Sequence, residues 1–363
     1  MSMIHDILAK AVAIGASDVH LKPNQAPFYR VNGELVESGF PVFSEDDMRC
    51  IVVDMLPEHV RKRNDGSTEI DLSHDEPHVG RFRVNIFMSR HVPTIALRHV
   101  KTQIPSVSQL HLPPQIEKIA QANAGIIILC GATSSGKSTT LAAMIQYINR
   151  TQRLRVITVE DPIEYLFMDD KCLITQREVG LDTPSFHSAL KHVLRQDPDV
   201  IMIGEMRDDT TLRVALSAAE TGHLVLTTIH ANTAPQAVIR ILEYFPVDER
   251  NQVRMALAGN LQAIICQRLV PSIDGKVRPA VEIMLNTPTV RKLLQKNELE
   301  TLAAAIETGT EDGMQTFNQS IYKLIKSGAI TEKYGLEYAT NPEALKMNLQ
   351  GIFLDESRRI LGS

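Results

Sequence analysis

Residues 125–140 read GIIILCGATSSGKSTT, an apolar run followed by a glycine-rich turn that ends in Gly-Lys-Ser. Residues 131–138 match the pattern G-x-x-x-x-G-K-[ST], in which a buried strand leads through a loop into a helix. Such a loop points backbone N–H groups at a phosphate, and the start of the helix favours the same negative charge. The stretch therefore predicts an α/β fold that binds a nucleotide, without indicating what the nucleotide is used for.

The residues of this loop have separate predicted roles. Lys137 is expected to reach the β- and γ-phosphates of ATP, Ser138 to ligate Mg²⁺, and Thr139 to approach the α-phosphate. The predicted ATP-binding residues are Ala132, Thr133, Ser134, Ser135, Gly136, Lys137, Ser138 and Thr139.

The composition excludes several classes of protein. At 363 residues the chain is long enough for two domains. It has no apolar run of 18 residues, and its first residues lack the basic start of a signal peptide, so we expect a cytoplasmic protein. The four cysteines form no C-x-x-C pair, which argues against a zinc site or a disulfide framework. A net charge of −5 argues against a dedicated nucleic-acid-binding protein.

Residues 1–101 are expected to form a small α+β domain. Apolar residues at helical spacing predict a helix over 4–14, and two short strands are expected at 18–21 and 28–31. Asn32-Gly33 indicates a hairpin after the second strand. The alternating runs 81–88 and 94–100 are expected to pair around a turn near residues 91–93. Residues 102–115 contain three prolines and are expected to be a linker.

From residue 116 to the end, apolar strands alternate with helical patterns, which predicts a mainly parallel sheet flanked by helices. After about residue 235 the pattern is mainly helical, and the tail beyond 340 is apolar enough that we expect it to pack. The predicted strands are 126–130, 156–159, 200–203 and 224–229, and the predicted helices are 138–149, 184–195, 210–221, 253–265 and 287–295.

Two groups of carboxylates follow predicted strands. Residues 200–205 read VIMIGE, an apolar strand whose end carries Glu205. A carboxylate there holds the water shell of a metal or orients the attacking water. Residues 159–164 read VEDPIE and place three carboxylates at the ligand-binding edge of the sheet. On its own, such an acidic loop is more often solvated than catalytic.

Histidines and arginines complete the candidate residues. His223 and His230 flank the strand 224–229 at a spacing that does not suit metal binding, and His230 fits a sensor of the γ-phosphate. Arg81 and Arg83 lie two positions apart on a strand, so they face the same side. With Arg98 they form either a set of phosphate-binding arginines or a solvated basic face.

Taken in order, these motifs resemble the ATPases of type II secretion and type IV pili, and more closely the PilT-like motors of the pilus retraction branch. The stretches that carry the resemblance are ASDVHLKP, GRFRVN, VEDPIE, QREVG, IMIGEMRD, SAAETGHL, TGHLVLTTIHANTA and GMQT. The resemblance implies a PAS-like N-terminal domain and a RecA-like ATPase domain with a helical C-terminal part. It also implies a ring of six copies, with ATP held between the two domains.

The resemblance also assigns roles to single residues. Glu205 matches the catalytic glutamate of this family, and Glu164 matches an acidic-box glutamate that serves the metal and the water. The other catalytic positions that it implies are His223, His230, Arg81, Arg83, Arg98 and Arg240.

Three departures separate this chain from the retraction motors that it resembles. Ala132 and Ser134 replace a proline and a glycine of the usual loop, so Ser134 has to adopt the dihedral angles of that glycine. Residues 289–296 read TVRKLLQK, with the final charge reversed relative to the retraction motif. The long apolar tail is more similar to the accessory, PilU-like paralogues.

The resemblance implies a mechanical ATPase that drives pilus retraction and twitching motility. It would lie at the cytoplasmic side of the inner membrane and act on a platform protein there. The alternative is an accessory paralogue that supports a principal retraction ATPase. A nucleic-acid translocase with the same core is a third hypothesis, which would require a basic groove.

Overall fold

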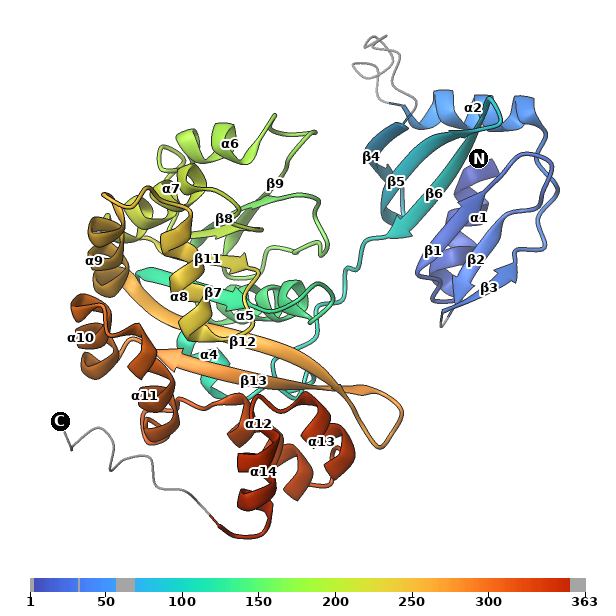
Figure 1. Cartoon of the computed structure of the whole chain (residues 1–363). Coiled ribbons are helices and arrows are strands. Elements are labelled where there is room, and N and C mark those ends of the chain that lie inside the picture. Colours follow the sequence, from blue (N-terminus) through green and yellow to red (C-terminus); the bar gives the residue numbers. More distant parts are fainter. Residues whose placement is uncertain (1–2, 32, 57–68, 353–363) are drawn as a thin grey trace. The chain divides into compact units, whose positions relative to one another are not determined.

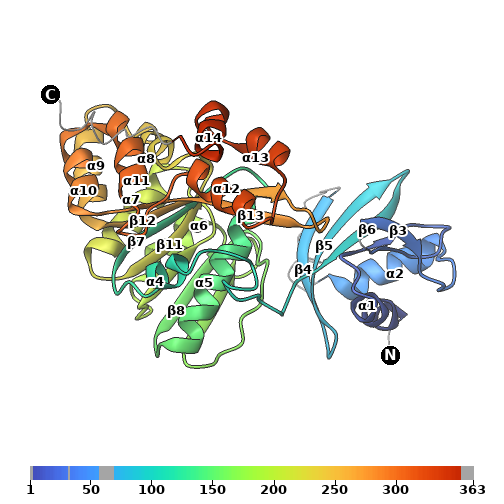
Figure 2. The ribbon, with the colours of Figure 1, turned by 90° about the horizontal axis from the view of Figure 1, so that it is seen from below.

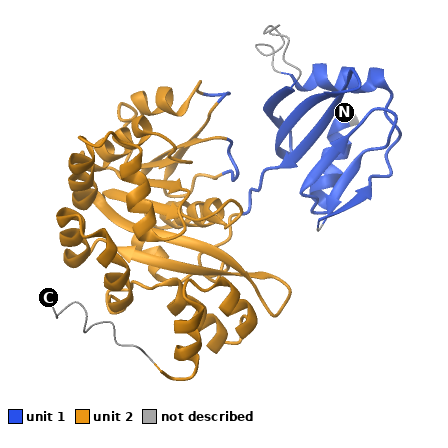
Figure 3. Ribbon diagram, in the orientation of Figure 1, with its two compact units in different colours: residues 1–103, 162–166, 180–182 blue, residues 104–161, 167–179, 183–363 orange. Residues whose placement is uncertain are grey.

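The chain divides into two units in this computed structural model, which describes residues 3–31, 33–56 and 69–352. Figure 3 colours the two units separately. Unit 1 contains residues 1–103 with the short segments 162–166 and 180–182, and unit 2 contains the remaining residues. No helix within these described ranges is long and apolar enough to cross a membrane.

Unit 1 is an antiparallel six-stranded sheet in the order β3-β2-β1-β6-β5-β4 (Figure 1). Val19, Leu97 and Val84 occupy neighbouring positions on three adjacent strands and face a core that both helices cover. The α+β expectation for this part of the chain is thus confirmed. Its elements are α1 (Met3–Ala13), β1 (Asp18–Leu21), β2 (Phe28–Val31), β3 (Glu34–Glu37), α2 (Glu45–Met55), β4 (Glu69–Glu76), β5 (Gly80–Ser89) and β6 (Val92–His99).

The turn between β5 and β6 is one position earlier than expected. Ser89 pairs with Val92, so Arg90 and His91 form the turn. Both turn residues have positive φ angles, 51° and 66°, which is the geometry of a tight two-residue hairpin.

Unit 2 is a seven-stranded sheet in the order β13-β12-β7-β11-β10-β8-β9, parallel except for the edge strand β13. Its strands are β7 (Gly125–Cys130), β8 (Arg155–Glu160), β9 (Leu173–Glu178), β10 (Val200–Ile203), β11 (Leu224–Ile229), β12 (Leu261–Pro271) and β13 (Val277–Leu285). Its helices are α4 (Gln115–Ala120), α5 (Lys137–Thr151), α6 (Phe186–Val193), α7 (Asp209–Glu220), α8 (Ala234–Glu243), α9 (Arg250–Asn260), α10 (Pro288–Lys296), α11 (Leu302–Thr308), α12 (Phe317–Lys326), α13 (Glu332–Tyr338) and α14 (Pro342–Leu349), with a 3₁₀ turn at Leu299–Thr301.

Helices cover both faces of this sheet (Figure 2). Alternate residues of β7 face opposite sides, since Ile126 and Ile128 belong to one buried cluster and Ile127 and Leu129 to another. The first cluster includes residues of α6 to α12, and the second includes residues of α4 and α5. The buried central strand therefore carries the loop that follows it on a rigid, three-layered support.

The predicted helix over 253–265 is wrong in its second half. Helix α9 ends at Asn260, and Leu261 begins the long strand β12, which pairs with β7 and β13. The region after residue 235 is mainly helical as expected, but it also contains the strand pair β12 and β13, which was not predicted, and β9 was not predicted either. Most residues of β12 are buried, and a continuous apolar run fits a buried helix as well as a buried strand.

The segment expected to be a linker is partly packed. Val107 and Leu112 are buried in the core that α4 and α5 share, so residues 104–115 belong to unit 2. The apolar tail packs as expected as far as α14, where Leu345 is fully buried. Phe353 and Leu354, which were part of the same expectation, lie outside the described residues.

Candidate active site

The glycine-rich loop joins the end of β7 to the start of α5, and two of its glycines are required by their surroundings. Gly131 has a φ of 149°, and a Cβ there would lie 2.4 Å from Ser135 Oγ and 2.6 Å from the carbonyl oxygen of Gln267. Gly136 has a φ of 87°, and a Cβ there would lie 2.7 Å from Gln267 Nε2. A side chain at either position would displace the loop, so the tight turn depends on glycine.

Ser134 has a φ of 63°, in the left-handed region that favours glycine. This strain was expected from the sequence, because a serine occupies a position where the usual loop has a glycine. The loop therefore keeps its turn at the expense of local backbone strain at one exposed residue.

The loop residues fit a phosphate. Ser135 Oγ is buried and has no hydrogen-bond partner among the residues that the structure describes. Lys137 Nζ donates hydrogen bonds to the carbonyl oxygens of Gly131 and Ala132, at 2.8 and 2.9 Å, and so holds a cation over the loop. The helix that begins at Lys137 adds the positive end of its dipole.

The donor set also fits Mg²⁺ bound as part of a nucleotide complex. Within the described ranges no three His, Cys, Asp or Glu side chains gather to hold a metal by themselves. Mg²⁺ in nucleotide sites takes few protein ligands and completes its shell with phosphate oxygens and water. Ser138 lies in the first turn of α5, and its role as a hydroxyl ligand of Mg²⁺ remains a prediction.

His230 connects the loop to the predicted catalytic carboxylate. Its Nδ1 lies 3.2 Å from the carbonyl oxygen of Gly131, and its Nε2 lies 3.1 Å from Glu205 Oε1. Both partners are acceptors, so the imidazole donates to both only when each ring nitrogen carries a proton. Residues from the ends of β7, β10 and β11 are thus brought together at the carboxyl edge of the sheet.

Glu205 is held in its charged form. Burial is the largest influence and raises the pKa of its carboxyl group, but the hydrogen bond from Arg207 and the charges of Arg207, His230 and Lys137 together lower it below 4.5. The bond joins Arg207 Nη2 to Glu205 Oε2 at 2.7 Å. The same bond raises the pKa of Arg207. The site therefore presents a carboxylate rather than a carboxylic acid at neutral pH.

The backbone around Glu205 is fixed by its neighbours. Gly204 donates its N–H to the carbonyl oxygen of Val159 at 2.8 Å, and its own carbonyl oxygen accepts from Thr228 Oγ1 at 2.8 Å. Met206 donates to the carbonyl oxygen of Thr228 at 3.0 Å. Bonds to β8 and β11 thus fix Gly204 and Met206, the residues on either side of Glu205.

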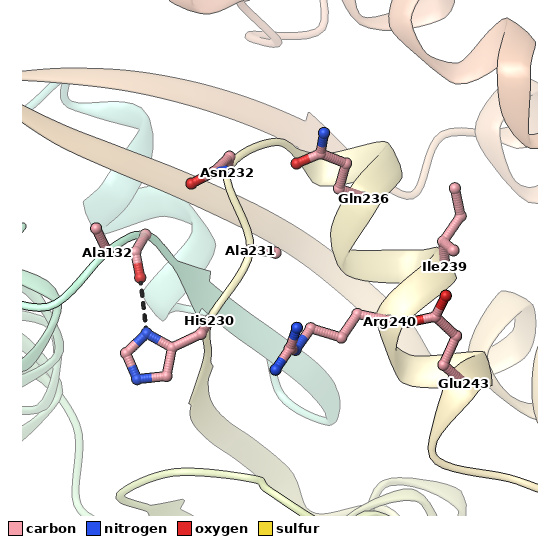
Figure 4. Close-up of a pocket in the computed structure, with 9 residues that line it drawn as sticks. Ala132, His230, Ala231, Asn232, Gln236, Ile239, Arg240 and Glu243 are labelled. Carbon is pink, nitrogen blue, oxygen red and sulfur yellow. Dashed lines mark hydrogen bonds between the residues drawn. The ribbon is translucent and has the colours of Figure 1, made fainter.

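A cavity of about 430 Å³ adjoins the loop and contains Arg240 (Figure 4). Helix α8 places Arg240 on this cavity, and its guanidinium points toward the side of His230 in Figure 4. The other lining residues are Gly131, Ala132, His230, Ala231, Asn232, Gln236, Ile239 and Glu243. The structure therefore brings Arg240, a predicted site residue, to the neighbourhood of the loop.

His223 lies at the opposite end of β11 from His230. Its carbonyl oxygen accepts from Gly125, the first residue of β7, whereas the loop follows the last residue of that strand. At about 3.3 Å per residue, the two histidines are roughly 20 Å apart. His223 Nδ1 contacts the carbonyl oxygen of Ala218 at 3.0 Å and Thr221 Oγ1 at 3.1 Å. The structure does not bring this predicted residue to the loop.

The residues of the acidic box fall into two groups. Glu160 is buried at the end of β8, where its Oε1 accepts from Thr158 Oγ1 at 2.6 Å and Gln176 Nε2 at 3.0 Å. Glu164 is exposed and belongs to the segment 162–166, which groups with unit 1. Its role as a ligand of Mg²⁺ remains a prediction.

The three arginines of unit 1 share one face of the sheet, opposite to its helices. Arg83 lies directly across from Arg98 on the neighbouring strand. Arg98 Nε donates to Asp18 Oδ1 at 2.8 Å, and Arg81 Nη1 donates to Asp75 Oδ2 at 3.2 Å. The expectation that Arg81 and Arg83 face one side is confirmed by the alternation along β5, and their role toward a nucleotide remains a prediction.

Sequence reasoning missed two residues next to the site. Arg207 lies two positions after Glu205, in a stretch already singled out, so its charge beside a carboxylate was a usable signal. Gln267 contacts the loop from β12, and nothing in its local sequence indicates this because the contact depends on the pairing of β12 with β7.

Comparisons with known proteins agree with the site. A family model described as type II/IV secretion system protein matches residues 1–341. The chain is 42% identical over 345 residues to the type IV pilus ATPase PilU of Pseudomonas aeruginosa, covering 95% of this chain and 90% of the relative. It is 37% identical over 340 residues to the type IV pilus retraction ATPase PilT of the same organism, covering 94% of this chain and 99% of the relative.

A solved structure extends this similarity to the fold. The crystal structure of the pilus retraction motor PilT with bound ADP matches with a TM-score of 0.88 at 40% identity, over 95% of this chain and 99% of that one. The sequence and the structure thus agree over almost the whole length, and the chain belongs to the family of type II/IV secretion system proteins.

Proposed function

We propose that this protein is a motor ATPase that hydrolyses ATP to drive the retraction of type IV pili, the process behind twitching motility. One observation carries the chemical part of the proposal: His230 joins the glycine-rich loop to Glu205. The proposal that hydrolysis drives pilus retraction rests on the relatives named as pilus ATPases, because the hydrolytic site alone does not indicate which structure is moved.

The loop and Lys137 bind the phosphates in this mechanism. Backbone N–H groups of residues 132–138 surround the phosphate oxygens, and Lys137 exchanges its two carbonyl partners for the β- and γ-phosphates. Mg²⁺, when bound through Ser138, neutralises charge on these oxygens.

Glu205 orients the attacking water in this mechanism. A carboxylate with a lowered pKa is a weak base, so it serves better to position a water by accepting its hydrogen bond than to remove its proton early. His230 contacts both Glu205 and the loop, and it therefore links the water site to the state of the phosphates. Glu164 and the arginines of unit 1 remain proposed contributors that act with these residues.

The proposed assembly is a homo-hexamer at the cytoplasmic face of the inner membrane. There it would act on the platform protein of the pilus machine, with no part for nucleic acid. Salt-dependent binding of DNA at physiological ionic strength would instead favour a translocase.

A hydrolysis assay of the purified chain tests the enzymatic part. We expect phosphate release that requires Mg²⁺ and falls by a factor of about 100 or more in Lys137→Ala, because the charge that neutralises the phosphates is lost. Lys333→Ala removes an exposed lysine of α13 and serves as the matched control. Normal activity of Lys137→Ala would contradict the proposal.

An accessory role is the second candidate function. The chain is 42% identical to PilU and 37% identical to PilT, and residues 289–296 differ from the retraction motif in their last charge. In this form the protein would act together with a paralogous retraction ATPase. Pilus retraction in cells that carry this gene alone would exclude it, and retraction only beside a principal motor would support it.

A further inference from the structure

Strand β12 extends past the end of β7 and reaches under the glycine-rich loop. Cys266 pairs with Cys130, the last residue of β7, so Gln267 lies level with the first residue of the loop. Both required glycines of the loop pack against this one residue, Gly131 against its carbonyl oxygen and Gly136 against its side-chain amide.

The side chain of Gln267 makes two hydrogen bonds, one to the loop and one to the helix after it. Its Nε2 donates to the carbonyl oxygen of Ser135 at 2.8 Å, and its Oε1 accepts from Thr140 Oγ1 at 2.8 Å. Gln267, Ser135 and Thr140 are only 4%, 6% and 1% exposed, so water does not replace these bonds easily.

A loop that turns its N–H groups toward a phosphate turns carbonyl groups away from it, and these need donors of their own. Lys137 and His230 contact two of the loop's carbonyl groups, those of Gly131 and Ala132. Gln267 serves the carbonyl of Ser135 from the protein interior.

We infer that Gln267 is a positioning residue for the nucleotide: it holds the loop in its phosphate-binding conformation and ties it to the first turn of α5. This inference rests on the proposed function, because it concerns the same phosphate site. A glutamine suits the position because its amide donates to the carbonyl and accepts from the hydroxyl at the same time.

The alternative is that Gln267 only stabilises the core. Gln315 offers a matched control, because it is a buried glutamine with the same pattern of bonds, one strand further from the loop, against the edge strand β13 that neighbours β12. Its Nε2 donates to the carbonyl oxygen of Val281 on β13 at 3.1 Å, and its Oε1 accepts from Lys323 Nζ at 3.0 Å. Gln315 is 7% exposed and bonds to an edge strand that does not carry the loop.

The test compares ADP affinity, measured by calorimetric titration of the intact protein, with the midpoint of thermal unfolding. We expect Gln267→Ala, which removes both bonds, to weaken ADP binding by about 10-fold, the size expected from loss of the buried bond to the Ser135 carbonyl, which holds the loop. Gln315→Ala should lower the midpoint of thermal unfolding by about as much as Gln267→Ala does. It should change ADP affinity by less than about 2-fold.

Thr140→Val gives a milder variant that keeps the shape of the side chain and removes only its hydroxyl. It should weaken ADP binding by less than Gln267→Ala, and adding it to Gln267→Ala should cause little further loss, because the hydroxyl acts through Gln267. Equal affinity of Gln267→Ala and the wild type, or equal weakening by Gln315→Ala, would overturn the inference. Failure of the wild type to bind ADP would overturn the proposed function and this inference with it.

Discussion

At the scale of single residues, the charge of Glu205 depends on a small number of contacts. Burial favours the neutral acid, and the hydrogen bond from Arg207 is the largest of the influences that oppose it. The low pKa that results keeps the carboxylate available to a water molecule over the whole neutral range. Arg207 is therefore the residue through which the chemistry of the site is most easily tuned.

Replacing Arg207 with alanine should shift the pH dependence of hydrolysis. Activity that needs the Glu205 carboxylate is present above its pKa and is lost as the pH falls through it, so in the wild type this loss occurs below pH 4.5. In Arg207→Ala the acid limb of kcat/KM should move upward, because the strongest lowering contact is gone. Arg213→Ala, which removes an exposed arginine of α7 paired with Glu249, should leave the limb in place. An unchanged limb in Arg207→Ala would contradict the account.

Ser134→Gly should stabilise the protein. The serine has a φ of 63°, and relief of a left-handed angle is worth about 1 kcal/mol. For a unit of this size, such a gain raises the midpoint of thermal unfolding by about 2–4 °C. Ser134→Ala keeps the strain and should give no gain. A fall in the midpoint of Ser134→Gly would show that the serine side chain contributes a contact that outweighs the strain.

The sequence predicted the residues of the site whose chemistry is local. The glycine-rich loop, Glu205 at the end of a strand and His230 at the end of the next are recognisable because each follows its own short motif. Gln267 was not predictable in this way. It lies 136 residues after Gly131 in the sequence, and only the pairing of β12 with β7 brings it to the loop.

At the scale of elements, β12 and β13 are the part of the fold that the sequence indicated least well. The run LQAIICQRLV follows directly on α9 without a proline or a polar break. The spacing of its apolar residues fits a buried strand as well as a continued helix. Only the pairing with the neighbouring strands β7 and β13 shows that it is a strand. Strands β7, β8, β10 and β11 were predicted because glycines, acidic residues and helix caps mark their ends, whereas β9 was not.

Glu282 joins two helices to β13, and its loss should be costly. Its Oε1 accepts from the N–H of Ala234 at the start of α8 at 2.7 Å, and the carboxyl group also accepts from the N–H of Phe317 at the start of α12. Glu282→Ala leaves both donors without this partner and should lower the free energy of unfolding by about 2–4 kcal/mol. Glu337→Ala, at an exposed position of α13, should change it by less than about 0.5 kcal/mol.

The pH dependence of this effect has a defined sign. Burial is the main influence on Glu282 and raises its pKa above 4.5, against the bond from Ala234 and the charge of Arg268. The stability that a raised pKa contributes is complete below 4.5 and is lost as the pH rises through the higher value. In urea unfolding, the free energy of unfolding of the wild type should thus fall relative to that of Glu282→Gln as the pH rises from 4.5 through the raised pKa of Glu282. The opposite trend would mean that the carboxylate is better solvated than the structure indicates.

At the scale of the whole molecule, the order of the two units follows from composition and pattern. A short-stranded α+β part precedes a part in which buried strands alternate with helices, and both were predictable without knowledge of contacts. The boundary was less predictable, because Val107 and Leu112 are apolar residues among prolines, and only the packing shows that they are buried in unit 2.

The most direct test of the central claim compares ATP binding and ATP hydrolysis in Glu205→Gln with the wild type, in the presence of Mg²⁺. The glutamine keeps the size of the side chain but removes the charge that orients the water, while the loop and Lys137 are left intact. The account predicts that ATP affinity stays within about 3-fold and that the turnover rate falls by a factor of about 100 or more. Hydrolysis by Glu205→Gln at the wild-type rate would contradict it.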